Sequence, residues 1–232
     1  MFNSANLLVF VNVEDFINAA LDKFVELKSL LVSISYDTDL LALENIAGFN
    51  AKWIETCHKH PALVVDSRTK SANYAAIKNC KPADNFILAW TLSPESIVNQ
   101  YEPMTASLKG RIKSIANALN DGWQVRICID PVLLVPDWQD LYLELIDQLY
   151  AQLPMDKVNA ITIGGFRIHQ DYFKKIKNLR TKDWLFNYPY STPDANAPKM
   201  MSYSKEKMEE ITELLKSKLT DKGFKQDRIF AC

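Results

Sequence analysis

The thiols and imidazoles are the side chains of this chain best suited to bind a metal. Successive cysteines lie 23, 48 and 104 residues apart, at Cys57, Cys80, Cys128 and Cys232. No single loop can gather three of them as ligands. The closer set CHKH, at Cys57–His60, has no second ligand pair elsewhere, and cationic residues near a predicted helix end also suit the helix dipole. The sequence therefore predicts no metal site built by this chain's own residues.

A basic stretch and a group of aromatic residues could together bind nucleic acid. The cations of the stretch are Lys174, Lys175, Lys177, Arg180 and Lys182. They could contact phosphates, but a solvated helix face is the more common reason for such a run of cations. The aromatic residues that follow are Trp184, Phe186, Tyr188, Tyr190 and Tyr203. Their rings could stack on an extruded base or could pack a loop onto the protein.

Short apolar runs alternate with amphipathic helical patterns along the chain. The predicted strands are Leu8–Val13, Leu31–Tyr36, Leu63–Asp66, Phe86–Thr91, Trp123–Ile129, Val158–Ile163 and Arg228–Ala231. The predicted helices are Glu14–Lys28, Ser107–Asn120 (capped by Thr105 or Ser107), Trp138–Leu153 and Lys205–Leu219. This alternation is typical of a parallel sheet with right-handed crossovers. Six or seven such units favour an α/β fold of the partial (β/α)-barrel type.

The carboxyl ends of the predicted strands place a polar set where a parallel barrel forms its active site. The members of this set are Asn12, Tyr36, Asp37, Ser67, Arg68, Lys70, Thr91, Asp130 and Arg167. Loops are polar in general, so each member could also be an ordinary loop residue. The chain contains neither GxGxxG nor GxxxxGK[ST], which weighs against a dinucleotide or P-loop site.

Length and composition indicate one folded domain over residues 1–232. Hydrophobic residues make up 48% and charged residues 24% of the chain, so a full core can form. The net charge of −1 gives no overall field that would attract nucleic acid. No run is long enough to span a membrane, and the start resembles no signal peptide, so we expect a cytoplasmic protein. Residues 186–204, rich in proline and tyrosine, are predicted to form a long loop.

Several segments, in order, resemble the spore photoproduct lyase family of radical S-adenosylmethionine (SAM) proteins. ISYDTDLLALENIAGF (Ile34–Phe49) and SRTKSANY (Ser67–Tyr74) are similar to two of its β/α units. The segment Asn85–Ile112 resembles a strand followed by the family's "GTxSLxxRI" turn. IDPVLLVPDWQDLYLELIDQLY (Ile129–Tyr150) and ITIGGFRI (Ile161–Ile168) resemble its "DPI…GW…Y" and "SLGxLRF" segments. Each motif is weak alone, whereas the ordered set is more specific.

The resemblance implies a radical SAM-like partial barrel that binds SAM and a 4Fe–4S cluster and cleaves SAM to a 5′-deoxyadenosyl radical. In the lyase proper that radical reverses a thymine–thymine lesion in DNA. Carried over by position, the implied SAM-binding residues are Asp37, Thr38, Lys70 and Thr91. Tyr36 falls near the position of the lyase's hydrogen-donating cysteine and becomes the catalytic candidate. The candidates for substrate binding are Asp130, Arg167, Tyr188 and Tyr190.

The chain departs from the family pattern because it has no CxxxCxxC cluster loop, so the fold is expected to lack the family's first strand and that loop. One hypothesis is a radical SAM enzyme whose cluster loop is missing from this chain or is supplied by a separately encoded segment. A second is a cluster-free module that binds SAM, a nucleotide or DNA. A third is an inactive remnant with an open strand edge at Leu8–Val13, prone to self-association.

Overall fold

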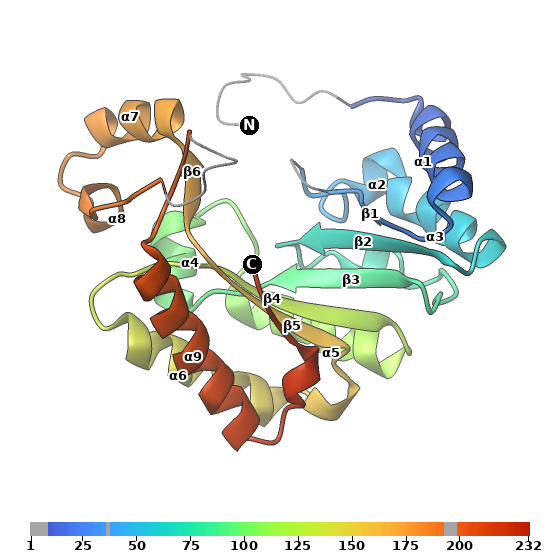
Figure 1. Cartoon of the computed structure of the whole chain (residues 1–232). Helices are drawn as coiled ribbons and strands as arrows, with labels where there is room; N and C mark the ends of the chain where they lie inside the picture. Colours follow the sequence, from blue (N-terminus) through green and yellow to red (C-terminus); the bar gives the residue numbers. More distant parts are fainter. Residues whose placement is uncertain (1–8, 36–37, 193–198) are drawn as a thin grey trace. The chain divides into compact units, whose positions relative to one another are not determined.

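A computed structural model of the chain describes residues 9–35, 38–192 and 199–232 (Figure 1). The chain divides into two compact units, which are described separately. The first comprises Met1–Thr91, Met104–Ile127 and Lys157–Asn159, and the second comprises Leu92–Pro103, Cys128–Asp156 and Ala160–Cys232. Strand β4 (Gln124–Val132) contributes residues to both units.

The first unit consists of strands covered by helices. Its strands are β1 (Leu30–Ser33), β2 (Leu63–Thr69), β3 (Phe86–Thr91) and the start of β4. Its helices are α1 (Val13–Leu27), α2 (Glu44–Ala47), α3 (Phe49–Lys59), the 3-10 turn η1 (Tyr74–Ala76) and α5 (Leu108–Asn120). All six side chains of β3 are buried, as expected for a central strand of a parallel sheet.

The second unit is arranged around the end of β4 and β5. Its helices are α4 (Glu95–Tyr101), α6 (Trp138–Gln152), the 3-10 turn η2 (Met155–Lys157), α7 (Gln170–Leu179), α8 (Trp184–Asn187), α9 (Lys205–Asp221) and the 3-10 turn η3 (Gln226–Arg228). Its strands are β5 (Ala160–Gly165), β6 (Arg167–His169), β7 (Met200–Ser202) and β8 (Ile229–Ala231). Helices α6 and α9 lie side by side (Figure 1) and bury their apolar faces.

The strands form a six-stranded sheet in the order β1-β2-β3-β4-β5-β8, with a separate pair β6-β7. The pairs β1–β2, β2–β3 and β5–β8 are parallel, and β6–β7 is antiparallel. The predicted α/β class is therefore confirmed. Helix α5 begins at one of the two predicted caps, because the Ser107 hydroxyl accepts a hydrogen bond from the Gly110 N–H at 3.2 Å.

The predicted strand at Leu8–Val13 is wrong for its described residues. Residues 9–12 form no strand, and α1 begins at Val13. Val11 is 85% exposed, so this apolar run is not buried. β-branched residues favour a strand only where a neighbouring strand pairs with their backbone, and none does so here among the described residues. Within the predicted loop 186–204, the structure places the end of α8 and the strand β7.

A buried carboxylate fixes the start of α3. Glu44 is 5% exposed and accepts hydrogen bonds from the Asn50 N–H and Nδ2 at 2.8 Å and from the Ala51 N–H at 2.9 Å. These backbone donors belong to the first turn of α3, where no intrahelical acceptor is available and negative charge is favoured. Glu44 therefore links α2 to the helix that covers β2.

Replacing Glu44 by alanine is expected to lower the free energy of unfolding by about 2 kcal/mol, because three donors, two of them buried, lose their acceptor. Chemical denaturation of the purified variant measures this change. The matched control is Glu55→Ala, since Glu55 lies on the exposed side of α3 and pairs only with Lys59 there. An equal effect of the two substitutions would contradict the capping role of Glu44.

Candidate functional site

The carboxyl ends of β2 and β3 lie level with each other in the first unit. Thr69, the last residue of β2, pairs in register with Trp90 of β3. Lys70 and Thr91 each follow this pair by one residue, so the two sequence-predicted residues occupy neighbouring positions at the same edge of the sheet. The Trp90 indole N–H also donates to the Ser71 carbonyl at 2.9 Å, which ties the segment after β2 to β3.

Asp39 holds the segment that carries Lys70. The Thr69 hydroxyl donates to Asp39 Oδ1 at 2.7 Å, and the Lys70 backbone N–H donates to Asp39 Oδ2 at 2.7 Å. The Ser71 N–H in turn donates to the Thr69 hydroxyl oxygen at 2.9 Å. Both oxygens of the carboxylate are thus used to fix one short stretch of backbone. Sequence reasoning missed Asp39; its position in the polar segment after the predicted strand Leu31–Tyr36 was the available signal.

Arg111 anchors the end of β3 from the neighbouring helix α5. Its side chain is fully buried, its Nη1 donates to the Thr91 carbonyl at 3.0 Å and its Nε donates to the Ala106 carbonyl at 2.8 Å. Its Nη2 donates to the Thr105 hydroxyl. The arginine of the "SLKGRI" segment therefore joins the end of β3 to the turn before α5. Thr91 itself is 2% exposed, whereas Lys70 is half-buried and Thr38 is exposed.

A carboxylate and a guanidinium meet at the carboxyl end of β5 in the second unit. Arg167 Nη2 lies 3.2 Å from both carboxylate oxygens of Asp130. The Asp130 side chain is 5% exposed and that of Arg167 is 41% exposed. Gly164 makes this approach possible, because a Cβ built on it would lie 2.6 Å from Asp130 Oδ1. The Arg167 guanidinium is therefore partly exposed to solvent, while the buried Asp130 carboxylate fixes its position.

Substituting Gly164 by alanine is expected to cost about 2 kcal/mol of stability, since the added methyl group displaces the Asp130 carboxylate. Loss of the Asp130–Arg167 contact should follow. Thermal unfolding together with a crystal structure of the variant measures both effects. Gly223→Ala is not a suitable control because Gly223 has a positive φ, so Ala151→Ser on the exposed face of α6, which adds one atom at the surface, serves instead. An unshifted Asp130 in the variant would contradict this prediction.

Three tyrosines of the second unit, Tyr188, Tyr190 and Tyr203, form one packed cluster. The ring of Tyr190 lies 5.4 Å from that of Tyr203, and Tyr188 lies 5.2 Å from Tyr190 and 5.1 Å from Tyr203. Tyr203 is fully buried, accepts from the Leu134 N–H at 3.1 Å and donates to the Val132 carbonyl at 3.2 Å. Desolvation, as the main cause, raises the pKa of Tyr190 above its ordinary range. The predicted site residues Tyr188 and Tyr190 thus make ring contacts within this cluster.

The basic stretch forms α7 and the residues after it. Lys175 Nζ lies 5.9 Å from the centre of the Tyr172 ring, and Lys177 Nζ lies 5.7 Å from that of Phe173. Phe173 is the residue of α7 that is buried. The other side of this helix is polar and accessible to solvent, so these contacts leave its cations on the surface of the second unit.

The structure places the predicted site residues in two sets. Thr38, Lys70 and Thr91 belong to the first unit, and Asp130 with Arg167 and the two tyrosines belong to the second. Tyr36 and Asp37, the catalytic candidate and one of the SAM-binding candidates, lie outside the described residues. The geometry therefore brings Lys70 beside Thr91 and Asp130 beside Arg167, and it gives no placement for residues 36–37.

The cysteines do not come together as a ligand set. Cys57 and Cys128 are buried, and burial raises the pKa of the Cys57 thiol to about 12. His58, beside Cys57 in the last turn of α3, contacts the Lys81 carbonyl at 3.0 Å. Across the part of the chain that the structure describes, no three side chains of His, Cys, Asp or Glu are grouped as metal ligands. The residues present therefore do not fit a cluster that needs three thiolates.

A family model described as "Spore photoproduct lyase" matches residues 1–229. The chain belongs to the spore photoproduct lyase family. Spore photoproduct lyase of Clostridium acetobutylicum is 24% identical over 146 residues, covering 62% of this chain and 43% of that protein. The enzyme of Bacillus subtilis strain 168 is 21% identical over 169 residues, covering 72% of this chain and 48% of that protein. The chain thus spans less than half the length of these two members of the family.

Solved spore photoproduct lyase structures share the fold of this chain. A cysteine-to-alanine variant with dinucleoside spore photoproduct superposes with a TM-score of 0.85 at 16% identity, over 96% of this chain and 67% of that one. A double variant described with bound AdoMet and the same dinucleoside gives a TM-score of 0.83 with the same coverage. These matches confirm the predicted partial α/β-barrel fold of the spore photoproduct lyase family. In the described part of the chain, every helix is too short or too polar to cross a membrane.

Proposed function

We propose that this family member binds SAM at the carboxyl edge of β1, β2 and β3 and contributes to radical SAM repair of a DNA photoproduct. The observation that carries the proposal is the level placement of Lys70 and Thr91 at the ends of two neighbouring parallel strands. Membership of the family supports SAM as the ligand. Parallel α/β folds in general bind their ligands at the carboxyl ends of the strands.

The donor set at this edge matches the polar groups of SAM. Lys70 offers a positive charge to a carboxylate, and the exposed Thr38 offers a hydroxyl group to the amino acid or ribose portion. Asp39 fixes the backbone at Lys70, and Arg111 fixes the backbone at Thr91. In this proposal Lys70 and Thr38 hold the ligand, while Asp39 and Arg111 position the segments around it. SAM would supply the radical chemistry of the family.

The second unit is the proposed lesion-binding side. Arg167 would contact a phosphate, with Asp130 orienting its guanidinium from behind. The rings of Tyr188 and Tyr190 would stack against a base turned out of the DNA helix. Arg167→Gln should then weaken binding of thymine-containing oligonucleotides at low salt.

The cluster is assigned to no residue of this chain, since its cysteines do not fit three-thiolate ligation. The proposed source is a segment carrying CxxxCxxC that is either continuous with this sequence in a longer protein or separately encoded. Anaerobic reconstitution with iron and sulfide, with and without such a segment, tests this point: binding of a 4Fe–4S cluster only in its presence is the expected result. A cluster formed by the purified chain alone would contradict this assignment.

Replacing Lys70 by alanine is expected to raise the dissociation constant of SAM about fivefold, as the loss of one partly solvated charged contact. Isothermal titration calorimetry on the purified chain measures it. Lys78→Ala removes the same charge from an exposed residue of the same unit and should leave the affinity unchanged. No saturable SAM binding by the native chain, or equal losses in both variants, would overturn the proposed site.

A second candidate is a cluster-free protein that uses the same edge to bind SAM, a nucleotide or DNA. The burial of Cys57 and Cys128 favours it, because buried thiols are structural rather than metal-binding. SAM affinity that is identical with and without the cluster-bearing segment and iron would favour this candidate. Reductive cleavage of SAM in the reconstituted mixture would favour the first.

A further inference from the structure

The second unit contains a pocket at the opposite end of β5 from Asp130 and Arg167. Its volume is about 520 Å³, within the range of small-molecule sites. It is formed by the end of α6, the turn η2 that leads into β5, and the segment from the end of α9 to η3 that leads into β8. Because η2 and η3 precede two parallel strands, the pocket lies at the amino ends of those strands.

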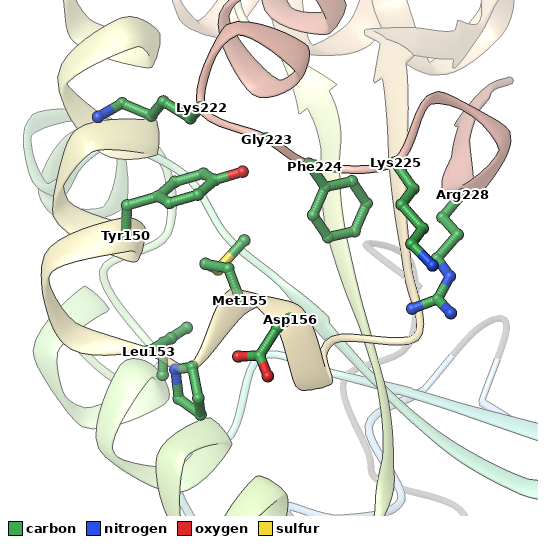
Figure 2. Close-up of a pocket in the computed structure, with 10 residues that line it drawn as sticks. Tyr150, Leu153, Met155, Asp156, Lys222, Gly223, Phe224, Lys225 and Arg228 are labelled. Carbon is green, nitrogen blue, oxygen red and sulfur yellow. The ribbon is translucent and has the colours of Figure 1, made fainter.

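One side of this pocket is apolar and aromatic. The rings of Tyr150 and Phe224 face the cavity with the side chains of Leu153 and Met155 (Figure 2). Phe224, Leu153 and Met155 are buried residues of the core, so the wall is fixed by core packing and only a small part of each side chain is accessible from the cavity. The Tyr150 hydroxyl donates to the Leu219 carbonyl at 3.2 Å, which fixes the orientation of that ring. A flat, apolar body of a ligand would fit against these groups.

The other side of the pocket is positively charged. Lys225 and Arg228 both line it, and their side chains extend in the same direction in the view of Figure 2. Neither has an ion-pair partner among the described residues. By contrast, the nearby Lys222 is 2.7 Å from Asp147 and lies over the Tyr150 ring. Since both cations line the same pocket, an anion bound in it would be attracted by both charges.

Asp156 supplies a polar contact of the other sign. Its carboxylate belongs to η2 and lines the same cavity, and it is drawn below Phe224 in Figure 2. A ligand N–H or O–H group could donate to it. The pocket thus combines an aromatic wall, two cations and one acceptor.

From this combination we propose that the pocket binds a small anion with an aromatic ring, and that it does so independently of the SAM site. The ring would lie against Tyr150 and Phe224, and the phosphate or carboxylate would lie between Lys225 and Arg228. Bidentate recognition by the guanidinium would orient the anionic group. The protein would then have a second ligand site, at the amino ends of β5 and β8.

Calorimetry on the full chain with three probes tests the proposal: adenosine 5′-monophosphate, indole-3-acetate and uncharged adenosine. Saturable binding of either anion, and binding of adenosine at least tenfold weaker, is the expected result. The phosphate probe binding better would identify a nucleotide-like ligand, and the carboxylate probe binding better would identify an aromatic acid. Saturable binding of neither anion would overturn the proposal.

Substitutions of the pocket residues test where the anion binds. Arg228→Gln and Lys225→Gln should each weaken the anion about fivefold, with the loss decreasing as salt is raised. Lys205→Gln removes an exposed charge from α9 outside the pocket and should change nothing. Lys70→Ala should also leave the affinity unchanged, which separates this site from the proposed SAM site. Equal affinity in the native chain and in both pocket variants would overturn the assignment.

Methyl NMR gives a readout of position that does not depend on affinity. With labelled methionine, the Met155 methyl signal should shift on titration with the anion, because Met155 lines the pocket. Met104 is 96% exposed in the other unit and should not shift. Shifts of Met104 without Met155 would show binding elsewhere and would contradict the proposal.

Discussion

Replacing Arg111 by methionine is expected to destabilise the protein by about 3 kcal/mol. The substitution keeps much of the apolar length of the side chain but removes every donor of a fully buried guanidinium. The carbonyls of Thr91 and Ala106 and the hydroxyl of Thr105 would all lose the hydrogen bond that Arg111 donates to them. A buried acceptor without a donor costs about 1–3 kcal/mol, and relief of the desolvation of the charge offsets part of the total.

Denaturant unfolding, followed by circular dichroism, measures the Arg111 effect. Lys109→Met removes an exposed positive charge from the same helix and should lie within about 0.5 kcal/mol of the native chain. Arg111→Lys keeps the charge but not the fork of donors, so it should fall between the two. A loss below about 1 kcal/mol for Arg111→Met would mean that the turn before α5 does not depend on this side chain.

Replacing Asp39 by alanine is expected to have the second largest effect, a loss of about 2–3 kcal/mol. Three hydrogen bonds to the carboxylate disappear, from the Thr69 hydroxyl and the Lys70 N–H at 2.7 Å and from the Ala42 N–H at 3.0 Å. Hydrogen bonds to charged groups contribute about 1.5–3 kcal/mol each, and partial exposure of Asp39 reduces the sum. The first residues after β2 should then exchange their amide hydrogens faster, while the Trp90 indole still holds the Ser71 carbonyl.

Hydrogen exchange at the Lys70 and Ser71 amides, together with thermal unfolding, measures this second effect. Exchange should accelerate at these two amides in Asp39→Ala. Asp84→Ala, which removes an exposed carboxylate from a loop of the same unit, should leave both amides protected. If SAM binds as proposed, its affinity should also fall in Asp39→Ala although Lys70 is intact. Unchanged protection at Lys70 would contradict the role of Asp39.

The sheet and helices were largely predictable because their signals are local. The fully apolar run of β3 gave its bounds without error, and the Ser107 cap placed the start of α5. Ordered motifs also identified the family over most of the chain, which the family match confirms. Period and capping act over a few residues, so a single sequence contains them. The same reasoning failed at Leu8–Val13, where a strand would need a partner that the described structure does not provide.

The contacts that fix the candidate site were decided by the tertiary structure. Asp39 and Lys70 are 31 residues apart, and Asp130 and Arg167 are 37 apart. Neither pair has a spacing that a local pattern could indicate. Gly164 reads as an ordinary strand residue until the structure shows the Asp130 carboxylate lying where its side chain would be. The amino-acid sequence thus determined the strands, helices and family of this protein. Which polar groups meet at the ends of those strands was decided only when long-range packing brought distant segments together.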